Sequence, residues 1–438
     1  MSDAIPLPPR PNLEQYKKIA KDLQRACQSS DPKAIREWAL RWTENAFRLS
    51  GSEFTREVQR QTAFAAEHIE QRWRKFIKTN PCTVCALSDV QLFIAREHGF
   101  ASWPKFAKHV EAVARAHSPV SNFEAAADAI VSGDLEGLKK LLRDDPELVR
   151  ARSTREHRST LLHYVSANGV EDFRQKTPNN ILEITRLLLG AGADVHAESD
   201  AYGGGSTTLE LIATSVHPER TDAQEDLMTI LLDRGAKLDH PGNRQKIVNI
   251  CLANGRGKAA EFLALRDAPL DLEGAAGVGR LDLVKNYFDK NGRIKLPGTR
   301  KQMEDGFAWA CEFGRTPVVD FLLQKGVPID AKLRHDGQSG LHWAAYGGHA
   351  ATVKLLLNRG ASIDVRDQRY GGTPLDWALY AWNNSLPSPE HYYEVVALLV
   401  QAGARLDPEV DDDGRHAAEK IRSDPRMVAA LRGEIYDE

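Results

Sequence analysis

A short phrase, Gly-Ala-x-x-Asp or a close variant, recurs through the C-terminal two thirds of the chain, and a leucine-rich stretch with helical spacing precedes each copy. The copies that start at Gly326 and Gly360 are separated by one period of about 34 residues. The intervals from 192 to 235 and from 360 to 403 are longer, and they correspond to one repeat with an insertion of about ten residues. Such a period indicates a repeat protein, in which each helical unit buries its apolar face only against its neighbours.

One unit displays the repeat most fully. It reads Gly340-Leu341-His342-Trp343-Ala344-Ala345-Tyr346-Gly347-Gly348-His349, then Val353-Lys354-Leu355-Leu356-Leu357 and Gly360-Ala361. This sequence resembles the ankyrin-repeat family, whose pattern is T-P-L-H-x-A-A-x-x-G-H, with Ser339-Gly340 in place of Thr-Pro. A second unit keeps Thr373-Pro374 and has Asp376 at the position of the family's histidine. The resemblance implies about eight repeats, each with a turn and two helices, and a polar unit that caps the stack.

Residues 1–118 lack the repeat but show helical periodicity. We expect helices over residues 13–27, 31–49, 53–78, 88–98 and 102–116, with Gly99 ending the fourth. This segment carries 19 Lys and Arg against 13 Asp and Glu, a net charge of +6, while residues 119–438 carry 39 and 48, a net charge of −9. Residues 91–106 resemble a segment that precedes ankyrin repeats in bacterial proteins, which favours a bacterial origin.

The predicted fold is therefore all-α. An N-terminal helical domain (1–118) precedes an ankyrin-repeat solenoid (119–408) with short β-turn tips, and a C-terminal cap (409–438) follows.

Composition excludes several classes of protein. The 438 residues are 42% hydrophobic and 27% charged, and the net charge of −3 creates no strong field toward nucleic acid or acidic lipid. The longest apolar runs are far shorter than the roughly 20 residues that cross a bilayer, and the N-terminus has no signal-peptide pattern. Five cysteines exclude a disulfide-stapled secreted scaffold. We therefore expect a soluble, cytoplasmic protein in a reducing compartment.

A lone C-x-x-C motif, Cys82-Thr83-Val84-Cys85, lies in the N-terminal segment. Structural zinc needs four ligands, and no second pair of residues has metal-ligand spacing. We expect two ordinary thiols, with a metal site or a redox pair as the alternatives. We predict no metal and no cofactor.

In ankyrin repeats the first helices and the turns usually form a concave face that binds another protein. Trp309, Trp343 and Trp377 occupy one position of three successive first helices, each one repeat period after the last. This ladder indicates either an aromatic platform for a ligand or packing between first helices. Further aromatic residues nearby favour an interface. The predicted binding residues are Tyr164, Asn168, Tyr202, Asn254, Trp309, Glu312, Phe313, Trp343, Tyr346, Trp377, Tyr380 and Trp382.

Insertions and turns add to this face. The insertions over residues 170–180, 216–224 and 382–390 are either part of the binding site or neutral surface loops. The glycine-rich turns at 202–207 and 370–373 are expected to be repeat tips rather than anion sites, since neither has the lysine of a phosphate-binding loop.

The sequence contains no motif of a hydrolase nucleophile, a zinc protease or a nucleotide-binding loop. We predict a non-catalytic scaffold that binds a protein partner, but neither nucleic acid nor membrane, through an aromatic-rich concave face. The alternative is an enzyme or a small-molecule or carbohydrate receptor, with a pocket lined by tryptophans and by the carboxylates of Glu210, Glu273, Glu312 and Asp376. Three of these, Glu210, Glu273 and Asp376, occupy the family's histidine position, where bonding to a backbone turn is the other interpretation.

Overall fold

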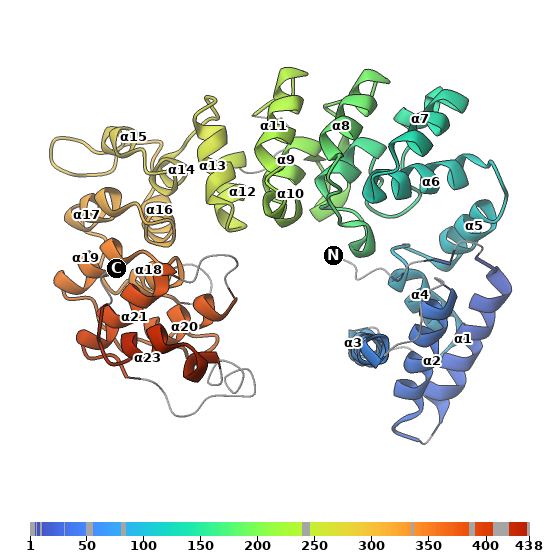
Figure 1. Cartoon of the computed structure of the whole chain (residues 1–438), viewed down its shortest axis with the longest axis horizontal. Coiled ribbons are helices and arrows are strands. Elements are labelled where there is room, and N and C mark those ends of the chain that lie inside the picture. The colour runs from blue at the N-terminus through green and yellow to red at the C-terminus, as the bar shows by residue number, and fades with distance from the viewer. Residues whose placement is uncertain are drawn as a thin grey trace. The chain divides into compact units, whose positions relative to one another are not determined.

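The structure is a computed structural model (Figure 1), and it describes residues 5, 7–8, 11–29, 31–49, 56–79, 85–238, 246–333, 337–384, 390–405 and 420–435. The chain forms two compact units, Met1–Lys237 and Leu238–Glu438. Helices make up most of the described residues in both units, which confirms the prediction of a mostly helical protein. The strands β1 (Glu198–Ser199) and β2 (Ser206–Thr207) form an antiparallel pair in the first unit, with Ser199 opposite Ser206.

Five helices begin the first unit at the places that the periodicity predicts. Their apolar faces enclose a core that includes Trp38, Trp42 and Trp73, and the indole N–H of Trp38 donates to the Ile19 carbonyl at 3.1 Å. Gly99 has a left-handed φ of 80° just after the fourth helix, a conformation that a residue without a side chain adopts readily. The helices are α1 (Leu13–Gln28), α2 (Ala34–Leu49), α3 (Arg56–Thr79), α4 (Leu87–Glu97) and α5 (Trp103–Val113).

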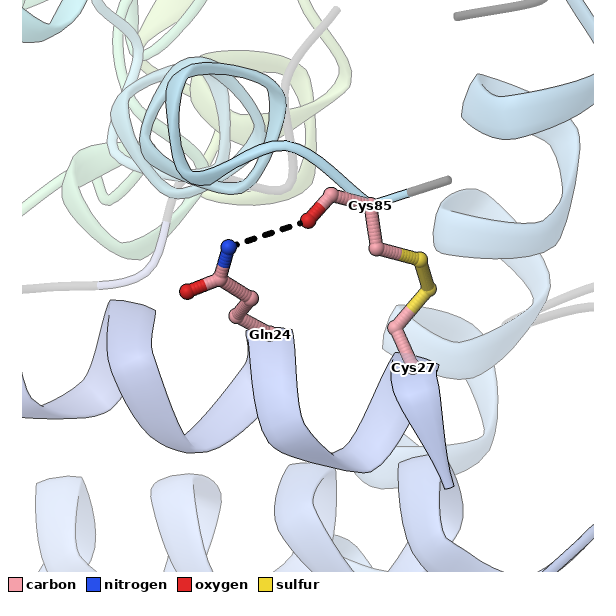
Figure 2. Close-up of a disulfide and its surroundings, with 3 residues drawn as sticks. All are labelled: Gln24, Cys27 and Cys85. Atoms are coloured by element: carbon pink, nitrogen blue, oxygen red, sulfur yellow. Dashed lines mark hydrogen bonds between the residues drawn. A yellow bond between two sulfur atoms is a disulfide. The ribbon is translucent and has the colours of Figure 1, made fainter. Parts of the chain in front are cut away.

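A disulfide joins Cys27, near the end of α1, to Cys85, just before α4 (Figure 2). Their Cα atoms lie 6.2 Å apart, and the side-chain amide of Gln24 donates to the Cys85 carbonyl at 3.2 Å. The expectation that Cys85 is an ordinary thiol is therefore wrong, because the fold brings it to a cysteine far away in the sequence. Cys82, the other half of the motif, lies outside the described residues.

Replacing Cys27 by serine should lower the melting temperature of the oxidised protein. A crosslink across a sequence separation of 58 residues stabilises a folded chain by up to about 4 kcal/mol, because it restricts the unfolded chain. Thermal unfolding of the wild type and of Cys27→Ser, each with and without a reducing agent, measures this contribution. The two proteins should melt together when reduced, and equal melting without the reductant would contradict the crosslink.

Three helical pairs follow α5 in the first unit, and each pair packs on the next. The first of these helices begins with Pro119. Proline has no backbone N–H, but the first N–H of a helix has no partner within the helix, so no hydrogen bond is lost there. Ser118 caps the helix, since its side chain accepts the Ser121 N–H at 3.0 Å. The pairs are α6 (Pro119–Ser132) with α7 (Leu135–Asp144), η2 (Leu161–Ser166) with α8 (Ile181–Gly190), and α9 (Thr208–Ala213) with α11 (Gln224–Asp233). The connections contain η1 (Pro146–Arg150), η3 (Asp172–Arg174), η4 (Ala201–Gly203) and α10 (Val216–Arg220).

The described residues of the second unit form five helical pairs, followed by helical residues 420–423 and a last helix. First helices pack on first helices and second helices on second helices, so that one apolar core continues from Leu272 to Ala430. The pairs are α12 (Ile247–Ala253) with α13 (Gly257–Ala264), α14 (Leu272–Gly277) with α15 (Leu281–Asn286), α16 (Arg300–Glu312) with α17 (Thr316–Gln324), α18 (Gly340–Tyr346) with α19 (Ala350–Asn358), and α20 (Pro374–Asn384) with α21 (Glu390–Gln401). The last helix, α23 (Pro425–Ala430), lies within the predicted cap and packs on α21.

A side chain closes the turn that begins a first helix. Before α18, the Nδ1 of His342 accepts the backbone N–H of Ser339 at 3.1 Å, and its Nε2 donates to the Gly372 carbonyl of the next turn at 3.1 Å. Before α20, Asp376 replaces the histidine, and its carboxylate accepts the N–H and the hydroxyl of Thr373, each at 2.8 Å. The turn needs an acceptor at the third position of the helix, and both side chains supply one.

Three buried histidines of the first unit make its stability depend on pH. Burial lowers the pKa of His98 to about 3 and those of His109 and His163 to about 4, from an ordinary value of 6.5. The unfolded chain therefore binds more protons below about pH 6.5, so the free energy of unfolding falls as the pH decreases from there toward about 4. Near pH 5 each buried histidine should lower it by about 2 kcal/mol.

Urea unfolding midpoints near pH 7.5 and pH 5 measure this loss. His98→Gln should reduce the difference between the two midpoints, and the exposed His391→Gln should leave it unchanged. Equal midpoints for the wild type at both pH values would contradict the prediction.

Candidate partner-binding surface

Three aromatic rings meet on α18 and α20 in the second unit. Ring centroids lie 5.4 Å apart for Trp343 and Trp377, 5.6 Å for Tyr346 and Trp377, and 6.2 Å for Trp343 and Tyr346. The rings meet edge to face, at interplanar angles of 71° to 87°, a geometry that aromatic pairs prefer. Tyr380, close by on α20, is 63% exposed, whereas the other three are half-buried. We name these four residues the aromatic cluster, and each of them exposes part of its ring to solvent.

The repeat length brings these rings together. Trp343 and Trp377 are one repeat period apart and so hold the same place in α18 and α20, which pack side by side. The indole N–H of Trp377 donates to the Asp367 carboxylate at 3.1 Å, and the same carboxylate accepts backbone N–H groups from Tyr370 at 2.8 Å and Gly372 at 2.9 Å. The hydrogen bonds of this turn therefore hold the ring of Trp377 in one orientation.

Trp309, the third tryptophan of the predicted ladder, is 3% exposed. Its indole N–H donates to the Glu273 carboxylate at 2.8 Å, and its ring stacks on Phe313 with centroids 6.3 Å apart. Of the two interpretations of the ladder, packing fits Trp309. The sequence also places Gly274 near Trp309, where the missing side chain could leave room for a pocket or permit a tight contact between repeats. The tight contact is what the structure has, since a Cβ at Gly274 would lie 2.6 Å from the side-chain oxygen of Asn249.

Three predicted binding residues lie in the first unit. Tyr164 is fully buried, so the prediction that it faces a partner does not fit its position in the core. Tyr202 is 63% exposed, and its hydroxyl donates to the side-chain oxygen of Asn168. Tyr202 and Asn168 thus contact each other in the first unit, whereas the aromatic cluster belongs to the second unit.

The remaining predicted residues divide by burial. Phe313 is half-buried and Asn254 is exposed, whereas Glu312 is 9% and Trp382 is 1% exposed. Trp382 belongs to the apolar core of the second unit, so its prediction as a surface contact does not fit the structure. Helical periodicity places such residues on a helix but gives no measure of how deeply the neighbouring repeat covers them.

Three of the four carboxylates of the enzyme alternative have structural contacts. Asp376 closes the turn before α20, and Glu210 accepts a backbone hydrogen bond from Thr207, as the turn interpretation predicts. Glu273 holds the indole of Trp309 instead. Burial raises the pKa values of Glu210 and Glu273. These contacts support the scaffold over the enzyme.

A buried network of two arginines and two glutamates, which the sequence did not reveal, lies in the first unit. Arg155 Nη1 lies 2.6 Å from Glu124 Oε1 and 2.8 Å from Glu171 Oε1, and Arg174 Nη1 lies 2.8 Å from Glu124 Oε2. The four side chains are between 1% and 11% exposed. Burial by itself would raise the pKa of Glu171, because it disfavours the charged carboxylate. The positive charge of Arg155 outweighs this effect and holds the pKa of Glu171 well below its usual range. The insertion over residues 170–180 is thus part of the core and not a neutral loop.

The network lies where the five N-terminal helices contact the first helical pairs. The Arg155 guanidinium carbon lies 5.5 Å from the ring centroid of Phe100, and the next residue donates its N–H to the Gly99 carbonyl at 3.2 Å. His109 Nδ1 and the Thr154 hydroxyl are 2.6 Å apart. The N-terminal helices and the first pairs are therefore joined by polar as well as apolar contacts.

Arg174→Met should destabilise the first unit by about 3–5 kcal/mol, because it leaves the two buried carboxylates of Glu124 and Glu171 with the single guanidinium of Arg155. Arg150→Met, on a side chain that is 69% exposed, is the matched control and should change stability by less than about 0.5 kcal/mol. Urea unfolding of the two variants measures both values. A similar loss in the two variants would contradict the assigned role of the network.

The other insertions differ in what the structure describes. In the insertion over residues 216–224, the Gln224 amide donates to the carbonyls of Ile212 at 2.9 Å and Ser215 at 3.0 Å. Residues 385–389 of the third insertion lie outside the described residues. Among the described residues, no helix is long and apolar enough to span a membrane, and no group of three His, Cys, Asp or Glu side chains could hold a metal ion.

Residues 307–412 match the family model of ankyrin repeats, which comprises three copies. No curated protein matches the chain. The matched stretch contains every member of the aromatic cluster and begins within α16. Ankyrin repeats are in general modules of protein–protein interaction.

Proposed function

We propose that this chain, which has ankyrin repeats over residues 307–412, is a non-catalytic scaffold that binds a protein partner through the aromatic cluster. The observation that carries the proposal is the set of packed but accessible rings on two successive first helices. Tyrosine and tryptophan supply much of the binding energy at protein interfaces, since they bury a large area and lose little side-chain entropy. Neighbouring ring contacts also hold the surface in place before binding.

The wider architecture belongs to the same proposal. The three helical pairs of the first unit and the five described in the second agree in number with about eight predicted repeats. The helical domain over 1–118 would precede these repeats, and the cap over 409–438 would end them. The cytoplasmic location and the bacterial origin remain predictions from the sequence.

The receptor or enzyme alternative has less support. Three of its four carboxylates, those of Glu210, Glu273 and Asp376, close turns or hold an indole, and the space beside Gly274 is filled. A small-molecule pocket would need apolar walls with a few converging polar groups. The protein-binding scaffold is therefore the function that the geometry supports best.

The double variant Tyr346→Ala and Tyr380→Ala should reduce recovery of the bound partner by about tenfold or more. Affinity capture from the source cell, with quantitative identification of the bound proteins, compares the variant with the wild type. Phe64→Ala, on an aromatic ring of the N-terminal helices that is 66% exposed, is the matched control. Partners of the cluster are those lost with the double variant and kept with the control, and equal recovery of every bound protein would contradict the proposal.

A further inference from the structure

A hairpin connects α15 to α16 in the second unit, and we name residues 287–299 the basic finger. Phe288 forms an antiparallel bridge with Ile294, and the Asp289 N–H donates to the Arg293 carbonyl at 2.9 Å. One residue further from the turn, at the base of the hairpin, the Lys295 N–H donates to the Tyr287 carbonyl at 2.8 Å. These backbone bonds give the finger a defined shape.

The finger is anchored at its root. The Phe288 ring is 8% exposed and meets the Phe321 ring edge to face, with centroids 5.4 Å apart. The Tyr287 hydroxyl donates to the Leu270 carbonyl at 3.3 Å. The root therefore contacts both the segment before α14 and helix α17 of the next pair, and the finger extends from a fixed base.

Cations dominate the finger and its base. Lys290, Arg293 and Lys295 are exposed on the finger, and Lys285 and Lys325 flank the Phe321 ring at its base, with Nζ 6.0 Å and 5.1 Å from the ring centroid. None of the five has an ion pair with another residue that the structure describes. Nearby cations on α16 differ, because Arg300 and Lys301 pair with Glu304 and Asp305 of the same helix.

The one carboxylate of the finger serves its turn. Asp289 Oδ1 accepts the backbone N–H groups of Asn291 at 2.9 Å and Arg293 at 2.8 Å. Asp289 thus shapes the hairpin, and Lys290, Arg293 and Lys295 have no carboxylate partner on the finger. In a chain of net charge −3, the finger is a local concentration of positive charge.

An exposed apolar side chain follows the hairpin turn, between Lys295 and the start of α16. Leu296 is 92% exposed and lies next to the exposed Pro297. All residues of the finger are described, and among them no other large apolar side chain is as exposed. Membrane association through a surface segment requires a broad apolar face, and single-stranded nucleic acid binding relies on exposed aromatic rings. The finger offers neither, because its aromatic rings are in its root.

We propose that the basic finger binds an acidic segment of a protein partner. The carboxylates of that segment would pair with Lys290, Arg293 and Lys295, and an apolar side chain would cover Leu296. This surface lies outside the aromatic cluster, so the proposal goes beyond the scaffold function and does not need the cluster to bind. Charge complementarity of this kind raises the association rate and selects partners by sign of charge.

The full chain can be tested with a fluorescent synthetic peptide of Glu and Asp residues around a central Leu, by fluorescence anisotropy. The triple variant Lys290→Glu, Arg293→Glu and Lys295→Glu should weaken peptide binding by about tenfold or more. The matched control, Lys332→Glu, Lys354→Glu and Arg432→Glu, changes the net charge equally at exposed sites elsewhere in the second unit, and it should weaken binding by less than about twofold, since long-range charge is screened.

Two further measurements separate the parts of the proposal. Leu296→Ser should weaken the affinity for the peptide by about threefold without changing the salt dependence of binding, because it removes an apolar contact and no charge. A variant with alanine at positions 290, 293 and 295 repeats the charge test if the glutamate variant unfolds, and it should weaken binding by about fivefold.

Three results would overturn the proposal. The wild type could fail to bind the acidic peptide at low salt, or the control triple variant could lose as much affinity as the finger variant. Vesicles containing phosphatidylserine, or a single-stranded oligonucleotide, could bind more tightly than the peptide through the same three cations. Partner capture by the aromatic cluster is read from Tyr346→Ala and Tyr380→Ala, so failure of one proposal is distinguishable from failure of the other.

Discussion

Stacking of each helical pair on the next is the constraint on which the repeats depend, because a short first helix cannot bury its apolar side alone. First helices approach so closely that some positions have no room for a side chain. A Cβ at Gly340 would lie 2.7 Å from the Phe307 ring, and one at Gly306 would lie 2.8 Å from the Ala276 Cβ. The ring of Phe307 thus explains why the sequence has Gly340 where the family pattern has proline.

The same stacking determines the surface. Residues one repeat apart lie side by side, so a tryptophan that recurs after one repeat period becomes a ring contact between Trp343 and Trp377. The turn before each first helix has to be closed by an acceptor, which is why Asp376 can stand where His342 stands one repeat earlier. Glu273 occupies the same family position, but its carboxylate accepts the indole N–H of Trp309. Local substitutions therefore change what the turn residue contacts while the stack is kept.

Sequence reasoning located the features that depend on short-range order. The five N-terminal helices, the repeat match over residues 307–412 and the turn-closing role of Asp376 follow from spacing and capping patterns. It failed where long-range contacts decide, as for the burial of Tyr164 and Trp382 and for the disulfide from Cys27 to Cys85. Periodicity assigns a residue to a helix face, but the depth of that face and the pairing of distant cysteines depend on which elements pack together. The sequence did contain one sign of the buried network of arginines and glutamates, since the insertion over residues 170–180 contains charged residues that a neutral loop does not need.

The two proposed surfaces, the aromatic cluster and the basic finger, would act over different distances and so would contribute to different stages of recognition. The charges of the finger act over about 8–10 Å at physiological salt, whereas the rings of Trp343, Tyr346 and Trp377 act only in contact, after water has been removed. Long-range charge mainly determines how fast partners meet, and buried contact mainly determines how slowly they separate. An acidic partner would therefore be drawn to the finger first, and its lifetime on the scaffold would depend on how much apolar surface it places on the rings.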